Sequence, residues 1–150
     1  MRSLRNRKIV GWLPLLLTLV GVGVLGAIRD NRFGGDVVWA RNYEDGLKQA
    51  RQTQRPLLFS FHTPGCGWCE KMDAEVFTDP RIVELTHSYV CVRLDTDLDP
   101  AVIKQFEVVD FPATILADSQ GRIVKRLSGY VTSERLAPAL RTVQNASAAP

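Results

Sequence analysis

Apolar and polar positions along the chain follow two different periods, which predict strands and helices in turn. Short runs of bulky apolar residues predict buried strands at residues 37–40, 56–61, 89–94, 111–117 and 122–127. Segments that open on a capping side chain and gather apolar residues on one face predict helices at residues 43–53, 66–77, 80–86, 100–106 and 133–143. Strands that alternate with helices and end in a hairpin indicate an α/β layered domain.

The longest apolar run lies near the N-terminus. Ile9–Ile28 spans 20 residues without a charged side chain, and a helix of that length is about 30 Å long, the thickness of the hydrocarbon core of a bilayer. The basic residues before it predict a cytoplasmic N-terminus and a domain on the other side of the membrane. The alternative is a cleaved signal peptide, although its apolar region would usually cover only about 7–15 residues. Both interpretations export the domain to a compartment where disulfides can form.

The length of 150 residues allows one domain of ordinary size. We expect a basic cytoplasmic segment at residues 1–8, an anchor or signal segment at 9–28 and a linker at 29–36. The α/β domain follows at residues 37–144, and a disordered tail at 145–150. The net charge of +3 follows the same division, because residues 1–32 carry a net +5 and residues 33–150 a net −2. The domain is therefore slightly acidic, which argues against nucleic acid as a partner recognised through bulk charge.

The chemically distinctive motif is Cys66-Gly67-Trp68-Cys69, which follows a predicted strand and opens a predicted helix. Two intervening residues bring the sulfur atoms together within one helical turn, so that a disulfide can close. At a helix N-terminus the free N–H groups and the helix dipole favour the nucleophilic thiolate form of Cys66. Cys69 lies one turn further in and would be the more protected, resolving thiol. This arrangement predicts a redox-active pair.

Other interpretations of the pair stay open. A zinc site needs four ligands, and the chain offers only Cys91, His62 and His87 besides the pair. A purely structural disulfide across two residues would close a very small loop and stabilise the fold little. Two inert buried thiols fit poorly with Gly65 and Gly67, which leave the first cysteine uncovered.

The pair and its surroundings resemble the thioredoxin-like superfamily over residues 37–143. The matching motifs are the strand PLLFSF before the pair, the strand YVCVRLD, the segment FPAT at 111–114, and IVKRLSGY with the terminal helix. The segment CEKM at 69–72, followed by VFTDP at 76–80, looks like the branch that contains the C-terminal domain of the bacterial thiol:disulfide interchange transporter.

This resemblance implies an α/β fold with a mixed sheet flanked by helices. It also implies the activity of a thiol:disulfide oxidoreductase, one that reduces protein disulfides rather than forming them. It implies protein disulfide or dithiol substrates and a redox partner protein, without a cofactor or metal ion. The branch serves the periplasm, so with Ile9–Ile28 as an anchor we expect a single-pass protein of the bacterial inner membrane, and we expect a monomer.

The resemblance also implies a substrate-binding loop. Phe111-Pro112 resembles the cis-proline loop of the family, which faces the cysteine pair. Pro112 would pack against the sulfur of Cys66 and leave the backbone of Phe111 free to pair with an extended substrate. Trp68 would lie exposed beside Cys66 and contact substrate.

The chain departs from thioredoxin at the usual proton acceptor. Thioredoxin has a buried aspartate six residues before the first cysteine, where this chain has Ser60, which cannot act as a carboxylate base. Asp73 shares a helix face with both cysteines by its spacing, and the related periplasmic domain has an acidic residue at that offset. Asp73 is therefore our candidate base for Cys69, with a solvated surface carboxylate as the alternative and with Glu70 and Glu75 as weaker candidates.

Two further residues bear on alternatives. His62 lies four residues before Cys66, where it could tune the thiolate or be an ordinary strand-end histidine. Together with Cys66 and Cys69 it could instead form a copper site, so a copper-delivery module is the alternative function, and a scaffold that binds clients without turnover is a third. Cys91 lies within a predicted strand, where packing in the core is the expected role.

Overall fold

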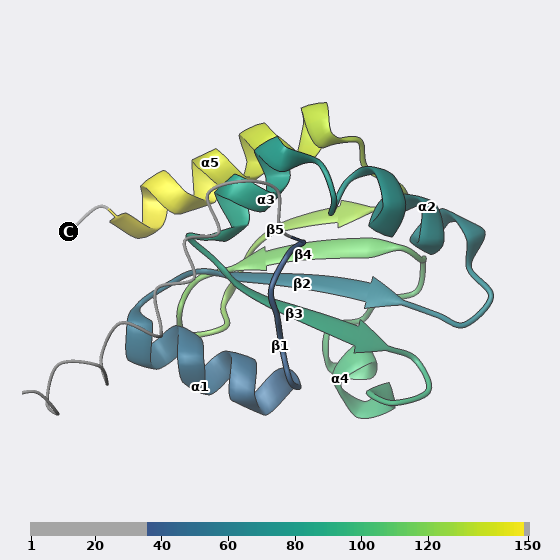
Figure 1. Ribbon diagram of the computed structural model, residues 1–150. Coiled ribbons are helices and arrows are strands. Elements are labelled where there is room, and N and C mark those ends of the chain that lie inside the picture. Colours follow the sequence, from purple (N-terminus) through teal and green to yellow (C-terminus); the bar gives the residue numbers. More distant parts are fainter. Residues whose placement is uncertain (1–35, 149–150) are drawn as a thin grey trace, which may run out of the picture. The chain divides into compact units, whose positions relative to one another are not determined.

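The computed structural model describes residues 36–148, which form a five-stranded sheet with helices on both faces (Figure 1). The strands lie in the order β1-β3-β2-β4-β5. Their bounds are Trp39–Ala40 for β1, Leu57–His62 for β2, Val90–Asp95 for β3, Ala113–Ala117 for β4 and Ile123–Ser128 for β5. Strand β3 pairs in parallel with β1 and β2, whereas β4 pairs antiparallel with β2 and β5. The predicted α/β domain with a closing hairpin is confirmed.

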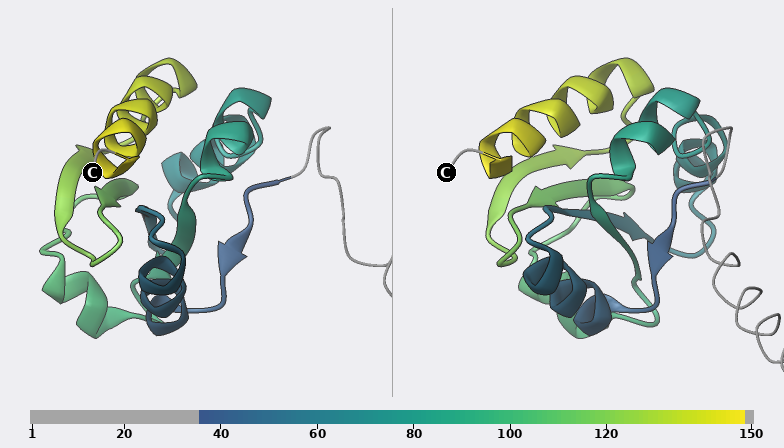
Figure 2. Two further views of the ribbon diagram at one scale, coloured as in Figure 1. Left: turned by 90° about the vertical axis from the view of Figure 1, so that its left-hand side faces the viewer. Right: turned by 60° about the vertical axis from the view of Figure 1, so that its left-hand side comes forward.

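The helices cover the two faces of the sheet in two groups (Figure 2). Their bounds are Tyr43–Thr53 for α1, Gly67–Glu75 for α2, Pro80–Thr86 for α3, Pro100–Gln105 for α4 and Ser133–Ala148 for α5. One apolar cluster joins Leu58 of β2 to Met72 of α2 and to residues of α3 and α5. The other joins Phe59 and Phe61 of β2 to α1 and the α4 region. Side chains of β2 therefore alternate between the two cores, as expected for a strand buried on both faces.

Local capping explains why the helices begin where the sequence predicts. Asn42 caps α1 by accepting a hydrogen bond from the N–H of Asp45 at 2.8 Å. Asp79 caps α3 by accepting from the N–H of Arg81 at 2.9 Å, and Pro80 takes the first helical position, where no N–H is needed.

The prediction of a disordered tail from residue 145 is wrong for residues 145–148, which continue α5 to Ala148. The segment Asn145-Ala146-Ser147-Ala148 contains no glycine or proline, and alanine favours the helix, so nothing stops propagation from Val143. The predicted cytoplasmic segment, the anchor Ile9–Ile28 and the linker up to residue 35 lie outside the described residues. Among residues 36–148, no helix combines the length and the apolar character needed to cross a bilayer.

Candidate active site

The cysteine pair lies at the start of α2, where the chain leaves the carboxyl end of β2. Cys66 is the N-cap of α2 and is joined to Cys69 by a disulfide with a Cα–Cα distance of 5.2 Å. The N–H of Cys69 donates a hydrogen bond to the sulfur of Cys66 at 3.1 Å. This donor and the helix N-terminus both favour negative charge on the sulfur of Cys66 when the pair is reduced.

The two cysteines differ in accessibility, as the sequence predicted. Cys66 is half-buried, whereas Cys69 is only 3% exposed and belongs to the core. Gly65 has a φ of +71°, a backbone conformation that favours glycine, and a Cβ at Gly65 or Gly67 would meet nothing within 4 Å. Open space on both sides of Cys66 leaves its sulfur open to a partner, while Cys69 is protected.

Strand register brings the predicted substrate loop to the same end of the sheet. Phe61 of β2 pairs with Ala113 of β4, and Ala113 pairs with Ser128 of β5. The segments just outside these pairs therefore lie beside the loop that leads to Cys66. One of them contains Phe111-Pro112, whose peptide bond is cis, as the resemblance implied.

A cluster of aromatic and charged side chains lies on α2 and on the segment that follows β5. Trp68 is 59% exposed, and its ring centroid lies 5.6 Å from that of Tyr130. The Nζ atom of Lys71 lies 5.2 Å from both ring centroids, and the Tyr130 hydroxyl donates to the Glu75 carboxylate at 2.8 Å. Sequence reasoning missed Tyr130, although an aromatic residue directly after the glycine that ends the hairpin was a usable signal.

A second group of polar side chains lies beneath α2. Ser60 is completely buried, and its hydroxyl lies 2.8 Å from Nε2 of His62, which is itself 8% exposed. Nδ1 of His62 lies 3.8 Å from Oδ2 of Asp73, and Arg93 donates to Oδ1 of Asp73 at 2.7 Å. Burial lowers the pKa of His62, an effect that the nearby Asp73 carboxylate partly offsets.

This network changes what Asp73 can do. Its carboxylate is paired with Arg93 of β3 and faces His62, so it is more than a solvated surface group. Of the weaker candidates, Glu75 binds Tyr130 and Lys71, and Glu70 is exposed. Sequence reasoning missed Arg93, because only the register of β3 against β2 reveals its place opposite Ser60.

The alternative metal sites find no support in this geometry. Among residues 36–148, no three or more His, Cys, Asp and Glu side chains are grouped so that they could hold a metal ion. His62 instead contacts Ser60 and Asp73 through its two ring nitrogens. Neither the three-ligand copper site of Cys66, Cys69 and His62 nor a four-ligand zinc site is therefore assembled in this geometry.

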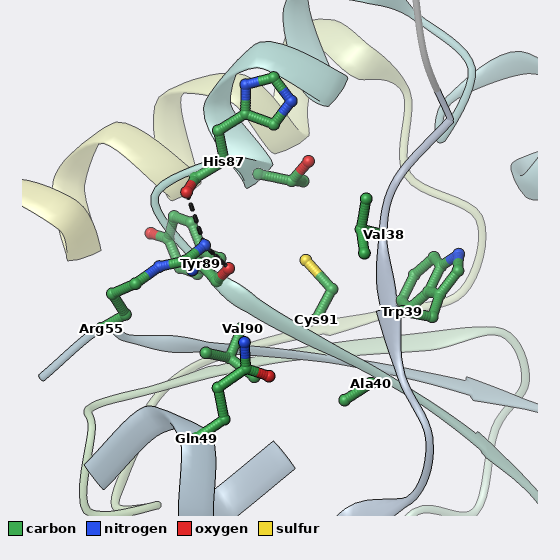
Figure 3. A pocket seen from close by; sticks show the side chains of 10 residues that line it. Val38, Trp39, Ala40, Gln49, Arg55, His87, Tyr89, Val90 and Cys91 are labelled. Carbon is green, nitrogen blue, oxygen red and sulfur yellow. Dashed lines mark hydrogen bonds between the residues drawn. The ribbon is translucent and has the colours of Figure 1, made fainter. Parts of the chain in front are cut away.

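The free cysteine lies apart from the pair. Cys91 is 2% exposed, and burial raises the pKa of its thiol to about 12. Cys91 pairs in register with Leu58 of β2. Leu58 lies four residues before His62, the last residue of β2, so about 13 Å of strand separates it from the end of β2 that leads to Cys66. Cys91 lines a cavity of about 320 Å³ beside β1, and Figure 3 shows it among the other side chains that line this cavity. A buried neutral thiol at this place agrees with the packing role that the sequence predicted.

Comparison with known proteins agrees with this geometry. The chain matches the family model for a thioredoxin-like domain over residues 43–144. It is 28% identical over 127 residues to anterior gradient protein 3 of Mus musculus, covering 75% of this chain and 77% of that protein. It is 33% identical over 99 residues to a thioredoxin of Alicyclobacillus acidocaldarius, covering 65% of this chain and 90% of that protein. It is 30% identical over 103 residues to the thiol:disulfide interchange protein DsbD of Ralstonia nicotianae, covering 65% of this chain but 17% of that protein.

Solved structures show the same fold. The solution structure of a thioredoxin from Thermus thermophilus matches with a TM-score of 0.68 and 21% identity, over 76% of this chain and 92% of that one. The structure of the DsbH oxidoreductase matches with a TM-score of 0.60 and 19% identity, over 76% of this chain and 86% of that one. The family match, the fold and the Cys66–Cys69 disulfide at the start of α2 agree with one another. The chain belongs to the thioredoxin-like domain family and is a thiol:disulfide oxidoreductase.

Proposed function

We propose that the protein is a membrane-tethered, extracytoplasmic reductase of protein disulfides. The observation that carries this proposal is the asymmetry of the pair, with Cys66 open at a helix N-terminus and Cys69 buried one turn away. A reductase needs one thiolate that reaches a foreign disulfide and a second thiol that only its neighbour can reach. The relationship to a thiol:disulfide interchange protein supports the same chemistry.

The proposed reaction has two exchange steps. The Cys66 thiolate attacks one sulfur of the substrate disulfide, so a bond from Cys66 to that sulfur forms and the other substrate sulfur leaves as a thiolate. Cys69 then loses its proton and attacks the sulfur of Cys66, which expels the second substrate sulfur as a thiolate. The substrate gains two electrons, and the protein ends with the Cys66–Cys69 disulfide. A redox partner protein must then reduce this disulfide by the reverse exchanges.

The remaining predicted site residues have roles in this scheme. Asp73 serves the deprotonation of Cys69, because it lies one helical turn beyond Cys69 on α2. The exposed ring of Trp68 and the segment Phe111-Pro112 bind the substrate chain on either side of Cys66. The antiparallel register that brings Ala113 beside Phe61 supports this location for the segment Phe111-Pro112.

The membrane tether and the location rest on the N-terminal sequence. Ile9–Ile28 would anchor a monomer with its domain in the periplasm, preceded by the basic residues 1–8. A fusion of alkaline phosphatase, which is active only outside the cytoplasm, to the C-terminus of the full chain tests this orientation. We expect an active fusion in the membrane fraction, and an inactive fusion would contradict the location.

Insulin reduction tests the activity. The full chain with a thiol reductant is expected to accelerate the reduction, and Cys66→Ser is expected to abolish the acceleration. Cys91→Ala is the matched control, because it removes a cysteine of the same domain that is remote from the pair, and it is expected to retain the wild-type rate. Equal rates for the wild type and Cys66→Ser would overturn the proposed function.

A further inference from the structure

Ser60 stands where thioredoxin has a buried aspartate, and a serine hydroxyl is too weak a base to take a proton from a thiol. The structure gives this hydroxyl a base of its own, because it lies 2.8 Å from Nε2 of His62. Both side chains are buried, at 0% and 8% exposure. A buried polar pair of this kind is stable only when its members satisfy each other, so the contact holds the imidazole at a fixed place.

Strand alternation puts this pair on the side of the sheet that carries Cys69. Leu58, Ser60 and His62 are alternate residues of β2 and share a face. Leu58 packs in the same apolar cluster as Met72 of α2, whereas Phe59 belongs to the opposite cluster. Ser60 and His62 therefore lie beneath α2, where Cys69 is buried.

Asp73 extends the pair toward solvent. It follows Cys69 by one helical turn, and its Oδ2 lies 3.8 Å from Nδ1 of His62. Asp73 also lines a surface cleft of about 380 Å³, together with residues of the β1 region, the segment after α2 and β3: Asp36, Val37, Trp39, Phe77, Thr78 and Arg93. The three side chains thus form a row from the buried Ser60 hydroxyl to a cleft that water can enter.

The charges around His62 suit a group that is neutral at rest and protonated for a short time. Asp73 of α2 and Asp95 of β3 favour the imidazolium, while burial and Arg93 of β3 oppose it. With Nδ1–H facing Asp73, Nε2 is left to accept from the Ser60 hydroxyl.

We propose that Ser60, His62 and Asp73 form a proton relay that deprotonates Cys69 when it resolves the mixed disulfide. The Ser60 hydroxyl gives its proton to Nε2 of His62 and takes the thiol proton of Cys69. The Cys69 thiolate forms the bond to the sulfur of Cys66, and the electron pair of the broken bond leaves on the substrate sulfur. Asp73 stabilises the imidazolium until its proton passes to water in the cleft. This relay rests on the proposed function, because it acts only if Cys69 resolves a mixed disulfide.

A single-turnover reaction with dithiobis(nitrobenzoate) separates the two steps. The reduced full chain, purified in detergent, releases one coloured thiolate when Cys66 attacks and a second when Cys69 resolves. His62→Gln and Ser60→Ala are expected to slow the second phase about 100-fold at neutral pH and to leave the first phase within about twofold. The second phase in the variants is expected to accelerate with rising pH, because hydroxide then takes over the removal of the thiol proton that the relay no longer accepts. His87→Gln, which changes the exposed histidine of α3's C-terminus, is the matched control and is expected to match the wild type in both phases.

The double variant Ser60→Asp/His62→Gln restores a carboxylate at the first relay position, and we expect its second phase to recover at least about tenfold over His62→Gln. Should His62→Gln fail to fold, Ser60→Ala carries the test alone, since it deletes a single hydroxyl. A second phase in either single variant with the wild-type rate and pH profile would overturn the relay. Two phases that persist in Cys66→Ser would instead show that the proposed function itself has failed.

Discussion

Asp73 and Arg93 form an ion pair beside His62, and the two partners act on the imidazole with opposite sign. Asp73→Asn removes the negative charge that favours the imidazolium, whereas Arg93→Met removes the positive charge that opposes it. Both variants abolish the same ion pair. We therefore expect Asp73→Asn to slow the resolution by Cys69 and Arg93→Met to accelerate it.

The size of the Asp73 effect follows from the geometry. A full charge 3.8 Å from Nδ1 of His62 would stabilise the imidazolium by about 4 kcal/mol at an effective dielectric constant of about 20. The Asp73 side chain is 33% exposed and its carboxylate is shared with Arg93 at 2.7 Å, so solvent and the guanidinium reduce this value to about 1–2 kcal/mol. A change of about 1.4 kcal/mol corresponds to a tenfold change in rate. Asp73→Asn is thus expected to slow resolution about tenfold.

The second phase of the dithiobis(nitrobenzoate) reaction measures these rates at neutral pH. Thermal unfolding of both variants is the control for folding, because an exposed ion pair contributes only about 0–1 kcal/mol to stability. Arg93 also lies 4.5 Å from the Trp39 ring centroid, so Arg93→Met loses about another 0.5–1 kcal/mol. If both substitutions change the resolution rate in the same direction, the pair acts through structure and the electrostatic reasoning is refuted.

Two further predictions concern the substrate surface and stability. Trp68→Ala removes an exposed ring that packs on Tyr130, so we expect kcat/KM for insulin to fall about threefold to tenfold, while the first phase with the small disulfide stays unchanged; equal losses in both assays would contradict a substrate-contact role. Hydrogen bonds from Arg81 and then Ser133 hold the pKa of Asp79 well below its usual range, so its charge stabilises the fold above the unfolded pKa of about 4, and this contribution is lost as pH falls toward the folded pKa. Asp79→Asn keeps a cap but not the charge, and its melting temperature is expected to lie below that of the wild type at pH 7. The difference is expected to narrow progressively as the pH falls below about 4; a constant difference between pH 7 and about pH 2 would contradict the assignment.

The sequence predicted most elements because their signals are local. The caps Asn42 and Asp79 mark the starts of α1 and α3, and both helices begin at the residues expected from them. The cysteine motif indicated a helix start at Cys66 and a second cysteine more protected than the first, and both are found, since Cys66 is half-buried and Cys69 is buried. These features depend on neighbours within a few residues, so a single sequence contains the information.

What the sequence did not predict depends on contacts between distant segments. Tyr130 meets Trp68 only because β5 ends beside α2, and Arg93 meets Asp73 only because β3 lies next to β2. The chemistry of Ser60 alone excludes a carboxylate base at its position, whereas the contact of its hydroxyl with His62, two residues along the strand, is a feature of the folded structure. The spacing of Ser60 and His62 predicts that they share one face of β2, because successive side chains of a strand point to opposite faces. Their burial under α2 depends on tertiary packing.

Trapping the mixed disulfide tests the central account most directly. Cys69→Ser leaves Cys66 able to attack but removes the resolving thiol, so the reduced variant incubated with insulin is expected to accumulate a covalent adduct. Peptide mass mapping is expected to place that adduct on Cys66, and Cys66→Ser treated in the same way is expected to form none. An adduct on Cys91, or equal adducts in both variants, would contradict the assignment of Cys66 as the attacking thiol and Cys69 as the resolving one.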